Sequence, residues 1–435
     1  MKWIAAAILI LLVAMVLNLA LLVYAMYAII AILLISKWVT SRWTQAIVAE
    51  RKCEADTAEI GDQVGVAIKL KHVGQFPITW VLVEDMLENR SLVYKPPSLS
   101  VNGRRLEVMK LRPGQTKLLT YQLQCNRRGY YQIGPLVLET GDMFGLNRRF
   151  RVLTDPVFLL VFPKIISIPS YDIASRRPIG EVVMTHRLFE DPTRIAGVRK
   201  YQEGDPLARV HWRATARTGI LQSKIYEPST LAGATIVVDF HKESFDSKGE
   251  PVRSELAITA AASVANALQE LGQQIGLISN GRDAVDRIRE EGWKGDRRTR
   301  EEARNAAVQM EDSDRLRPVV VPTCKSPQQM IHISKALARL EKTDGMRLSE
   351  LMIEAAARIP KDATVIVIVS TINMENAIAL GGLRRQGFCV EAIVNCFSEE
   401  EFAAVSGPLL AEGILTRHLK DESTVASICE KQVLR

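Results

Sequence analysis

The stretch from Thr235 to Phe240, TIVVDF, is an almost continuous apolar run, and it indicates the fold class of the C-terminal half of the chain. A helical pattern follows from Glu255 to Leu271. Further apolar runs (Ile275–Ser279, Val319–Val321, Val365–Val369 and Val390–Val394) alternate with helical stretches (Pro327–Leu340 and Leu348–Arg358). Strands that are buried on both faces and alternate with helices predict a parallel, doubly wound α/β sheet over residues 230–435.

Residues 55–155 have a different pattern, in which short strands are separated by turns. Apolar residues occupy every second position from Val64 to Leu70, as in a half-buried strand. Turn signals such as Pro113-Gly114 separate these segments, and none of them has a convincing helical pattern. This spacing predicts a β-sandwich of immunoglobulin-like size.

Residues 1–36 predict a membrane segment, because only Asn18 is conventionally polar between Ile4 and Ile35. As a single helix this run would be about 48 Å long, well beyond a hydrocarbon core of about 30 Å. Two arrangements remain open. One is a hairpin of two short spans that turns near Asn18, which we favour, and the other is one long tilted helix.

Basic residues predict the orientation of the chain in the membrane. Those that follow the apolar run closely are Lys37, Arg42, Arg51 and Lys52. Their excess on this side predicts an inner-membrane protein with a cytoplasmic C-terminal body. We expect residues 37–54 to form a juxtamembrane linker in which Trp38 and Trp43 serve as interfacial anchors.

Charge and cysteine content exclude some classes of protein. Lys and Arg outnumber Asp and Glu by 56 − 49 = 7, a modest surplus that suits contact with anionic membrane lipids. Because this surplus is small and aromatic residues are few, the chain is not expected to bind nucleic acid. The six cysteines are scattered without a C-x-x-C pair, which predicts reduced thiols rather than disulfides or a zinc site.

Residues 156–229 are expected to form a linker that contains the most distinctive segment of the chain. This segment is Val198–Glu227, VRKYQEGDPLARVHWRATARTGILQSKIYE. Asp205-Pro206 predicts the start of a helix and Gly219 its end. Arg209, Arg213 and Arg217 would then form one arginine ridge, with Trp212 on a neighbouring face that packs inward.

The arginine ridge has two possible roles. It may pair with acidic residues such as Glu190, Asp191 and Glu203 and so clamp the β-domain to the α/β-domain. Otherwise it is an exposed site for phosphate, an acidic partner surface or lipid headgroups.

This segment resembles the bacterial domain-of-unknown-function family 58 (DUF58), whose members are usually encoded beside MoxR-type AAA+ ATPases. The residues that match the family hallmark are Tyr201, Gly204-Asp205, Arg209, Trp212 and Ala216-Arg217. Two upstream stretches match as well, Arg128-Gly129-Tyr130 and Asp142–Leu146, although Met143 stands where proline is commoner. The resemblance implies a membrane-tethered protein with a von Willebrand type A-like domain, which works with a MoxR ATPase in assembling or activating other complexes.

A working type A domain would bind Mg²⁺ through Asp-x-Ser-x-Ser after its first strand. The equivalent residues are Asp239, His241 and Glu243, so the aspartate remains and both serines are replaced. Ser370-Thr371 stands where a further aspartate is expected. We therefore predict a degenerate remnant without metal, in which Asp239 caps the following turn. A cation held by Asp239 and Glu243, in a metal-dependent ligand-binding domain, is the alternative.

The expected function is that of a non-enzymatic adaptor without a cofactor, because the sequence contains no motif of a known catalytic site. The competing hypothesis is a cryptic hydrolase that acts on envelope material through His211 and Asp205. A charged insertion at residues 283–317, densest from Asp296 to Arg304, is expected to be a solvated insertion or an arm that docks a partner.

Overall fold

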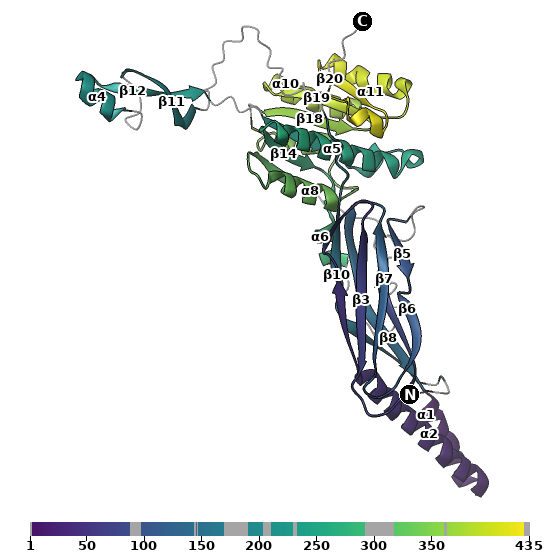
Figure 1. Ribbon diagram of the computed structural model, residues 1–435. Helices are drawn as coiled ribbons and strands as arrows, with labels where there is room; N and C mark the ends of the chain where they lie inside the picture. The colour runs from purple at the N-terminus through teal and green to yellow at the C-terminus, as the bar shows by residue number, and fades with distance from the viewer. Residues whose placement is uncertain are drawn as a thin grey trace.

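The computed structural model describes residues 2–87, 97–142, 145, 147–168, 190–202, 210–228, 233–291, 317–360 and 363–429. Figure 1 shows a helical hairpin at one end, a β-sandwich in the middle and an α/β domain at the other end, from which a small arm projects. Most of the charged insertion, including Asp296–Arg304, lies outside the described residues.

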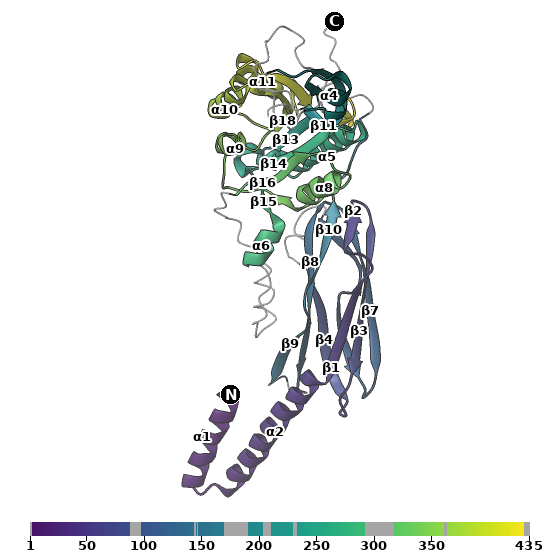
Figure 2. The ribbon, with the colours of Figure 1, turned by 90° about the vertical axis from the view of Figure 1, so that its left-hand side faces the viewer.

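The N-terminal apolar run forms two helices, α1 (Lys2–Val16) and α2 (Ala20–Gln45), which pack against each other (Figure 2). Between them Asn18 has a φ of 54°, a left-handed conformation that asparagine adopts more readily than most residues. The predicted turn near Asn18 is thus confirmed, and the single long helix is excluded. By length and composition alone, α2 is apolar enough to cross a membrane.

The end of α2 is part of the sandwich rather than a linker. The residues of α2 that are buried are Leu33, Ser36, Thr40, Trp43 and Thr44. They form one helical face against strands β8 (Gly129–Gly141) and β9 (Arg148–Thr154). Strand β1 begins at Ile47, directly after the helix. The prediction of a linker over residues 37–54 was therefore wrong. Trp43, only 7% exposed, packs in the sandwich core instead of anchoring the chain at a membrane surface.

Arg51 also differs from its expected role as a basic flank of the membrane segment. Its guanidinium is buried in the sandwich, where Nε donates to Asp85 Oδ2 at 3.1 Å. The Tyr121 hydroxyl donates to the same oxygen at 2.7 Å. Burial raises the pKa of Asp85, while Arg51 and Tyr121 act in the opposite direction. Of the predicted basic flank, Lys37 and Arg42 are exposed on α2 itself.

The sandwich consists of two sheets with a shared hydrophobic core. Its strands are β1 (Ile47–Cys53), β2 (Thr57–Glu59), β3 (Gln63–His72), β4 (Ile78–Leu87), β5 (Leu99–Gly103), β6 (Leu106–Leu111), β7 (Thr116–Cys125), β8 (Gly129–Gly141), β9 (Arg148–Thr154) and β10 (Val157–Phe162). One sheet has the order β1-β3-β7-β5, and the other has β2-β10-β8-β4-β6 with β9 paired to β8. The alternation from Val64 to Leu70 follows the buried face of β3, as predicted.

The α/β domain is built on a six-stranded sheet of order β16-β14-β13-β18-β19-β20. These strands are β13 (Gly233–Val238), β14 (Gln274–Ser279), β16 (Val319–Cys324), β18 (Ala363–Val369), β19 (Cys389–Asn395) and β20 (Leu415–Leu419). Each neighbouring pair is parallel except β14 and β16. The run at Val319–Val321 is therefore an antiparallel edge strand and not a further parallel strand.

Helices cover both faces of this sheet. Ile236 and Val238 of β13 face α5 (Val252–Glu270) and α8 (Gln329–Arg339), whereas Val237 faces α9 (Leu348–Ala355), α10 (Met374–Arg385) and α11 (Glu399–Ala411). Smaller elements are β15 (Arg282–Asp283), α6 (Ala284–Glu291), β17 (Leu340–Glu341) and 3-10 turns at Lys242–Ser244, Ser247–Gly249 and Glu422–Val425. The alternation of buried strands and helices thus has the doubly wound arrangement.

The arm is a two-stranded ribbon of β11 (Glu190–Lys200) and β12 (Gln222–Pro228) with the short helix α4 (Trp212–Thr218) between them. It projects away from the α/β domain in Figure 1. Residues 156–229 are therefore more than a linker, since their first part completes β10 and their last part forms this ribbon.

Candidate functional site

The arm displays part of the family signature, Trp212 and Ala216-Arg217, to solvent. Helix α4 begins at Trp212, and the His211 ring caps it by accepting the Ala214 N–H on Nδ1 at 3.0 Å. It ends at Gly219 as predicted, with a φ of 69°. The helix start predicted at Asp205-Pro206 lies outside the described residues. Trp212 is 68% exposed, so the prediction that it packs inward was wrong.

Two members of the arginine ridge, Arg213 and Arg217, are exposed on α4. Within the described part of the chain neither pairs with a carboxylate, and α4 contacts β12 rather than the sandwich. Tyr201 is held in the ribbon by a backbone bond from its N–H to Leu221 O at 2.9 Å. Gly204, Asp205 and Arg209 lie outside the described residues, so the His211–Asp205 pair of the hydrolase hypothesis stays a prediction.

Asp239 lies at the carboxyl end of β13 and is 1% exposed. Its carboxylate accepts hydrogen bonds from the Ser244 hydroxyl at 2.6 Å, the Asn280 amide at 2.8 Å and the His241 N–H at 3.3 Å. Both carboxylate oxygens of Asp239 therefore hold together the loop that follows β13. Asn280 was missed by the sequence reasoning, although a polar residue directly after the apolar run Ile275–Ser279 was a signal for it.

His241 and Glu243 do not converge on this carboxylate. His241 Nδ1 accepts the Glu243 N–H at 3.2 Å, and the exposed Glu243 side chain lies 3.7 Å from Arg347. Among the described residues, no three His, Cys, Asp or Glu side chains are grouped so that they could hold a metal ion. Nearby, the Ser370 hydroxyl accepts from the Asn395 amide at 3.3 Å, and Thr371 donates to Ser244 O at 3.3 Å. The sheet edge is thus filled by internal hydrogen bonds.

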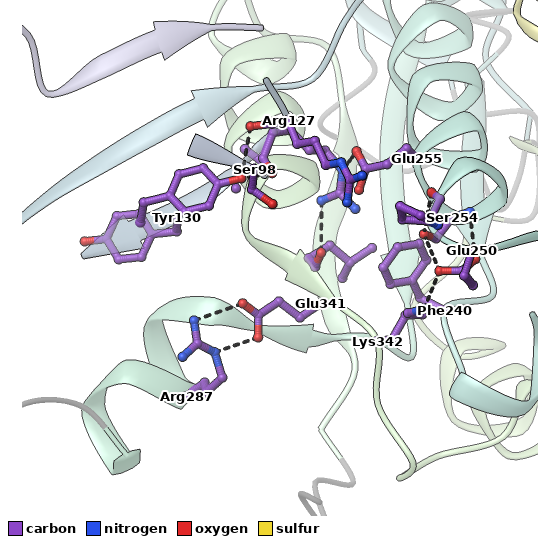
Figure 3. Close-up of a pocket in the computed structure, with 16 residues that line it drawn as sticks. Ser98, Arg127, Tyr130, Phe240, Glu250, Ser254, Glu255, Arg287, Glu341 and Lys342 are labelled. Carbon is purple, nitrogen blue, oxygen red and sulfur yellow. Dashed lines mark hydrogen bonds and ion pairs between the residues drawn. The ribbon is translucent and has the colours of Figure 1, made fainter. Parts of the chain in front are cut away.

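A cavity of about 220 Å³ lies where the sandwich meets the α/β domain (Figure 3). Its central residue is Arg128, which precedes β8 and is buried. Arg128 Nη1 donates to Leu337 O at 2.6 Å and to Leu340 O at 2.9 Å, the carbonyls that end α8. A cation at a helix C-terminus also interacts favourably with the helix dipole. Arg128 therefore makes an interdomain clamp, which was one of the two roles considered for the arginine ridge.

Two further contacts orient the Arg128 guanidinium. Its Nε lies 3.2 Å from Glu255 Oε2 of α5, an ion pair outside hydrogen-bond geometry. Its Cζ lies 5.5 Å from the ring centroid of Phe240, which follows β13. One side chain of the sandwich thus contacts three separate elements of the α/β domain.

The backbone that carries Arg128 is held by Tyr131. The Tyr131 hydroxyl lies 3.0 Å from Arg127 O and 2.9 Å from Arg128 O and donates to them. Burial raises the pKa of Tyr131, so the hydroxyl remains a donor. A Cβ at Gly129 would lie 2.7 Å from Tyr131 Cζ, so only glycine fits between this ring and the chain. The stretch Arg128-Gly129-Tyr130 thus has a structural role that its sequence did not reveal.

Four further charged residues around the cavity form two ion pairs. Arg287 donates to Glu341 through two bonds of 2.6 and 3.0 Å. Lys342 pairs with Glu250, which also accepts from the Ser254 hydroxyl at 2.8 Å. Figure 3 shows these two groups on different sides of the cavity. The two ion pairs thus tie α6 and the segment before α5 to the segment around β17.

The other end of β8 is tied to α2 by the second family stretch. Asp142 Oδ2 accepts from the Ser36 hydroxyl of α2 and from the Asn147 N–H at 3.0 Å. Arg151 of β9 donates to Thr44 O at 3.0 Å, near the C-terminus of the helix. Strand β8 therefore connects α2 at one end with the Arg128 clamp at the other.

Two known structures are similar to parts of this chain, both of them distantly. The CARDB domain of PF1109 from Pyrococcus furiosus is 15% identical with a TM-score of 0.18, and covers 26% of this chain and 86% of that one. Proximal thread matrix protein 1 from the mussel byssus is 11% identical with a TM-score of 0.29, and covers 46% of each chain. These scores are too low to support an argument about function.

Comparison with families and sequences is more informative. The family described as "Protein of unknown function DUF58" matches residues 197–353, from the arm to α9. The uncharacterized protein YeaD of Bacillus subtilis is 26% identical over 242 residues, which are 54% of this chain and 56% of that protein. The chain thus matches little more than half the length of this relative. Both matches support the assignment of the chain to the DUF58 family.

Proposed function

We propose that this protein is a membrane-anchored adaptor, in which a von Willebrand type A-like domain is held on the cytoplasmic side of the inner membrane. It would work with a MoxR-type AAA+ ATPase in assembling or activating other complexes. The ATPase and the type A-like description rest on the family resemblance. The doubly wound sheet supports the type A-like description, since ligands of such sheets bind at the carboxyl ends of the strands.

The observation that carries the proposal is a continuous series of contacts from α2 through the sandwich to the α/β domain. The helix is bonded to the sandwich through Ser36 and Asp142, and β8 leads from there to Arg128. Arg128 is bonded to the end of α8. A body that is tied at both ends is suited to positioning a partner.

We expect the ATPase to contact two surfaces, the arm and the carboxyl ends of the strands of the α/β sheet. The arm offers exposed Trp212 beside Arg213, and aromatic residues and arginine are enriched in protein interfaces. At the carboxyl ends of the strands the exposed group is Glu243.

The test uses the full chain in lipid nanodiscs, titrated with its cognate MoxR ATPase with and without a non-hydrolysable ATP analogue. We expect an affinity of roughly micromolar order that depends on nucleotide, as for a transient interface. Trp212→Ala, Arg213→Glu and Glu243→Arg should each weaken binding if they lie in the interface. The control is Lys69→Glu, an exposed position on β3 of the sandwich. Absence of binding at about 100 µM in every nucleotide state would reject the proposal.

A further inference from the structure

The apolar part of α2 is short for a bilayer. It runs from Ala20 to Ile35, which is about 24 Å at 1.5 Å per residue, whereas the hydrocarbon core is about 30 Å thick. Contact with the sandwich begins directly after this stretch, where the Ser36 hydroxyl donates to Asp142. If α2 is in a membrane, as the proposed function requires, the sandwich cannot stand away from the bilayer. Its end nearest to α2 must lie at the level of the headgroups.

An exposed aromatic cluster lies at this end of the sandwich. The loop between β3 and β4 carries Phe76, which is 54% exposed, and the exposed Val73. The Phe76 ring packs edge-on against Trp38 of α2 with 6.0 Å between centroids. Val73 N–H donates to Ala46 O at 2.8 Å, which fixes the loop beside the junction of α2 and β1. The cluster continues the exposed apolar surface of α2 through Ile35.

Exposed basic residues lie at the same end of the sandwich. They are Lys37, Arg42, Lys71, Arg112 and Arg149. The Arg42 guanidinium lies over the Trp38 ring at 5.6 Å. Strand register places Lys71 opposite Val48 at the start of β1, and Arg149 opposite Thr140 near the end of β8. All of these positions therefore belong to the end of the sandwich at which α2 is docked.

We propose that this end of the sandwich is a second membrane contact, selective for anionic lipids. Val73, Phe76 and Trp38 enter the interfacial region, where aromatic side chains are favoured, and the exposed Lys and Arg side chains at this end bind anionic headgroups. The contact holds the sandwich upright on the bilayer. Strand β8, with 13 residues at about 3.3 Å each, then places the Arg128 joint roughly 43 Å from the headgroups.

The experiment measures depth by fluorescence quenching on the full chain in nanodiscs of phosphatidylcholine and phosphatidylglycerol. Bimane is attached to Phe76→Cys in a background where the exposed Cys324 and Cys389 are serine. Ile60→Cys is the matched control, an exposed apolar position in the turn before β3. This turn is at the opposite end of the sandwich, because the first residue of β3 pairs with the end of β7. Leu21→Cys on α2 reports the anchor itself.

We expect lipids with a nitroxide near the headgroup to quench position 76 several-fold more than position 60, and lipids with a deep nitroxide to quench position 21. If position 21 is quenched while positions 76 and 60 are quenched to the same extent, the second contact is overturned and the membrane anchor is left intact. No quenching at 21 would instead reject the membrane anchor on which the inference rests.

Charge selectivity is tested with the same label. We expect quenching at position 76 to fall at least twofold in nanodiscs of phosphatidylcholine alone, and likewise in a Lys71→Glu, Arg149→Glu variant that keeps its melting temperature. Equal quenching in both lipid mixtures would overturn the selectivity for anionic lipids.

Discussion

Replacement of Arg128 by glutamine tests the joint between the sandwich and the α/β domain. The Arg128 guanidinium bonds to Leu337 O and Leu340 O, which lie 209 and 212 positions away in the chain. Glutamine keeps a polar side chain of moderate length but loses the charge and one of the two donor directions. The substitution therefore weakens the contact between domains without opening a large cavity in either core.

The expected magnitude follows from the contacts. A hydrogen bond from a charged donor contributes about 1.5–3 kcal/mol, so the two bonds of Arg128 together give roughly 3–6 kcal/mol. The ion pair adds at most about 1 kcal/mol, because the Glu255 side chain is 31% exposed. If the glutamine amide keeps one carbonyl bond, we expect a loss of about 2–4 kcal/mol at the joint.

Hydrogen exchange of the full chain, followed by mass spectrometry, measures this loss where it occurs. Protection of the amides at the end of α8 and in β17 should fall by roughly 30- to 900-fold, since 1.36 kcal/mol is a factor of ten. Amides in β3 and β7 should keep their protection. Arg104→Gln, at an exposed position between β5 and β6, is the matched control and should change neither region. Unchanged protection at the end of α8 in Arg128→Gln would refute the clamp.

Three further predictions concern single side chains. Gly129→Ala should lower the free energy of unfolding by about 1–3 kcal/mol in urea titrations, because its Cβ would overlap the Tyr131 ring; an unaltered midpoint would contradict this. Asp239→Ala should lower the free energy of unfolding by about 1–3 kcal/mol, because it leaves the buried hydrogen-bond donors of Asp239 unpaired. Millimolar Mg²⁺ should not raise the melting temperature of the unsubstituted protein. A rise that this substitution abolishes would show a cation site instead. Burial raises the pKa of Cys429 to about 12, so at pH 8 iodoacetamide should modify the exposed Cys324 first. Because the folded state keeps the Cys429 proton to higher pH than the unfolded state, stability should fall between the ordinary thiol pKa of 9.0 and about 12, and constant stability over that range would contradict the assignment.

The elements that the sequence alone determined are those set by local periodicity. The single polar residue in the apolar run, Asn18, marked the turn of the helical hairpin, and alternation from Val64 to Leu70 marked β3. The apolar run after Gly233 marked β13, which is buried on both faces. In each case the spacing of apolar residues reports burial directly, because a helix and a strand repeat with different periods.

The tertiary structure alone decided which element covers each buried face and which charged residue joins the domains. Apolar runs look alike in either direction, so the antiparallel pairing of β16 had no sequence signal. Trp43 was read as a membrane residue because it follows the apolar run, yet the sandwich supplies its surroundings. Arg213 and Arg128 are equally basic in sequence. Only Arg128 meets the end of α8, because that contact depends on how chain segments more than two hundred residues apart pack together.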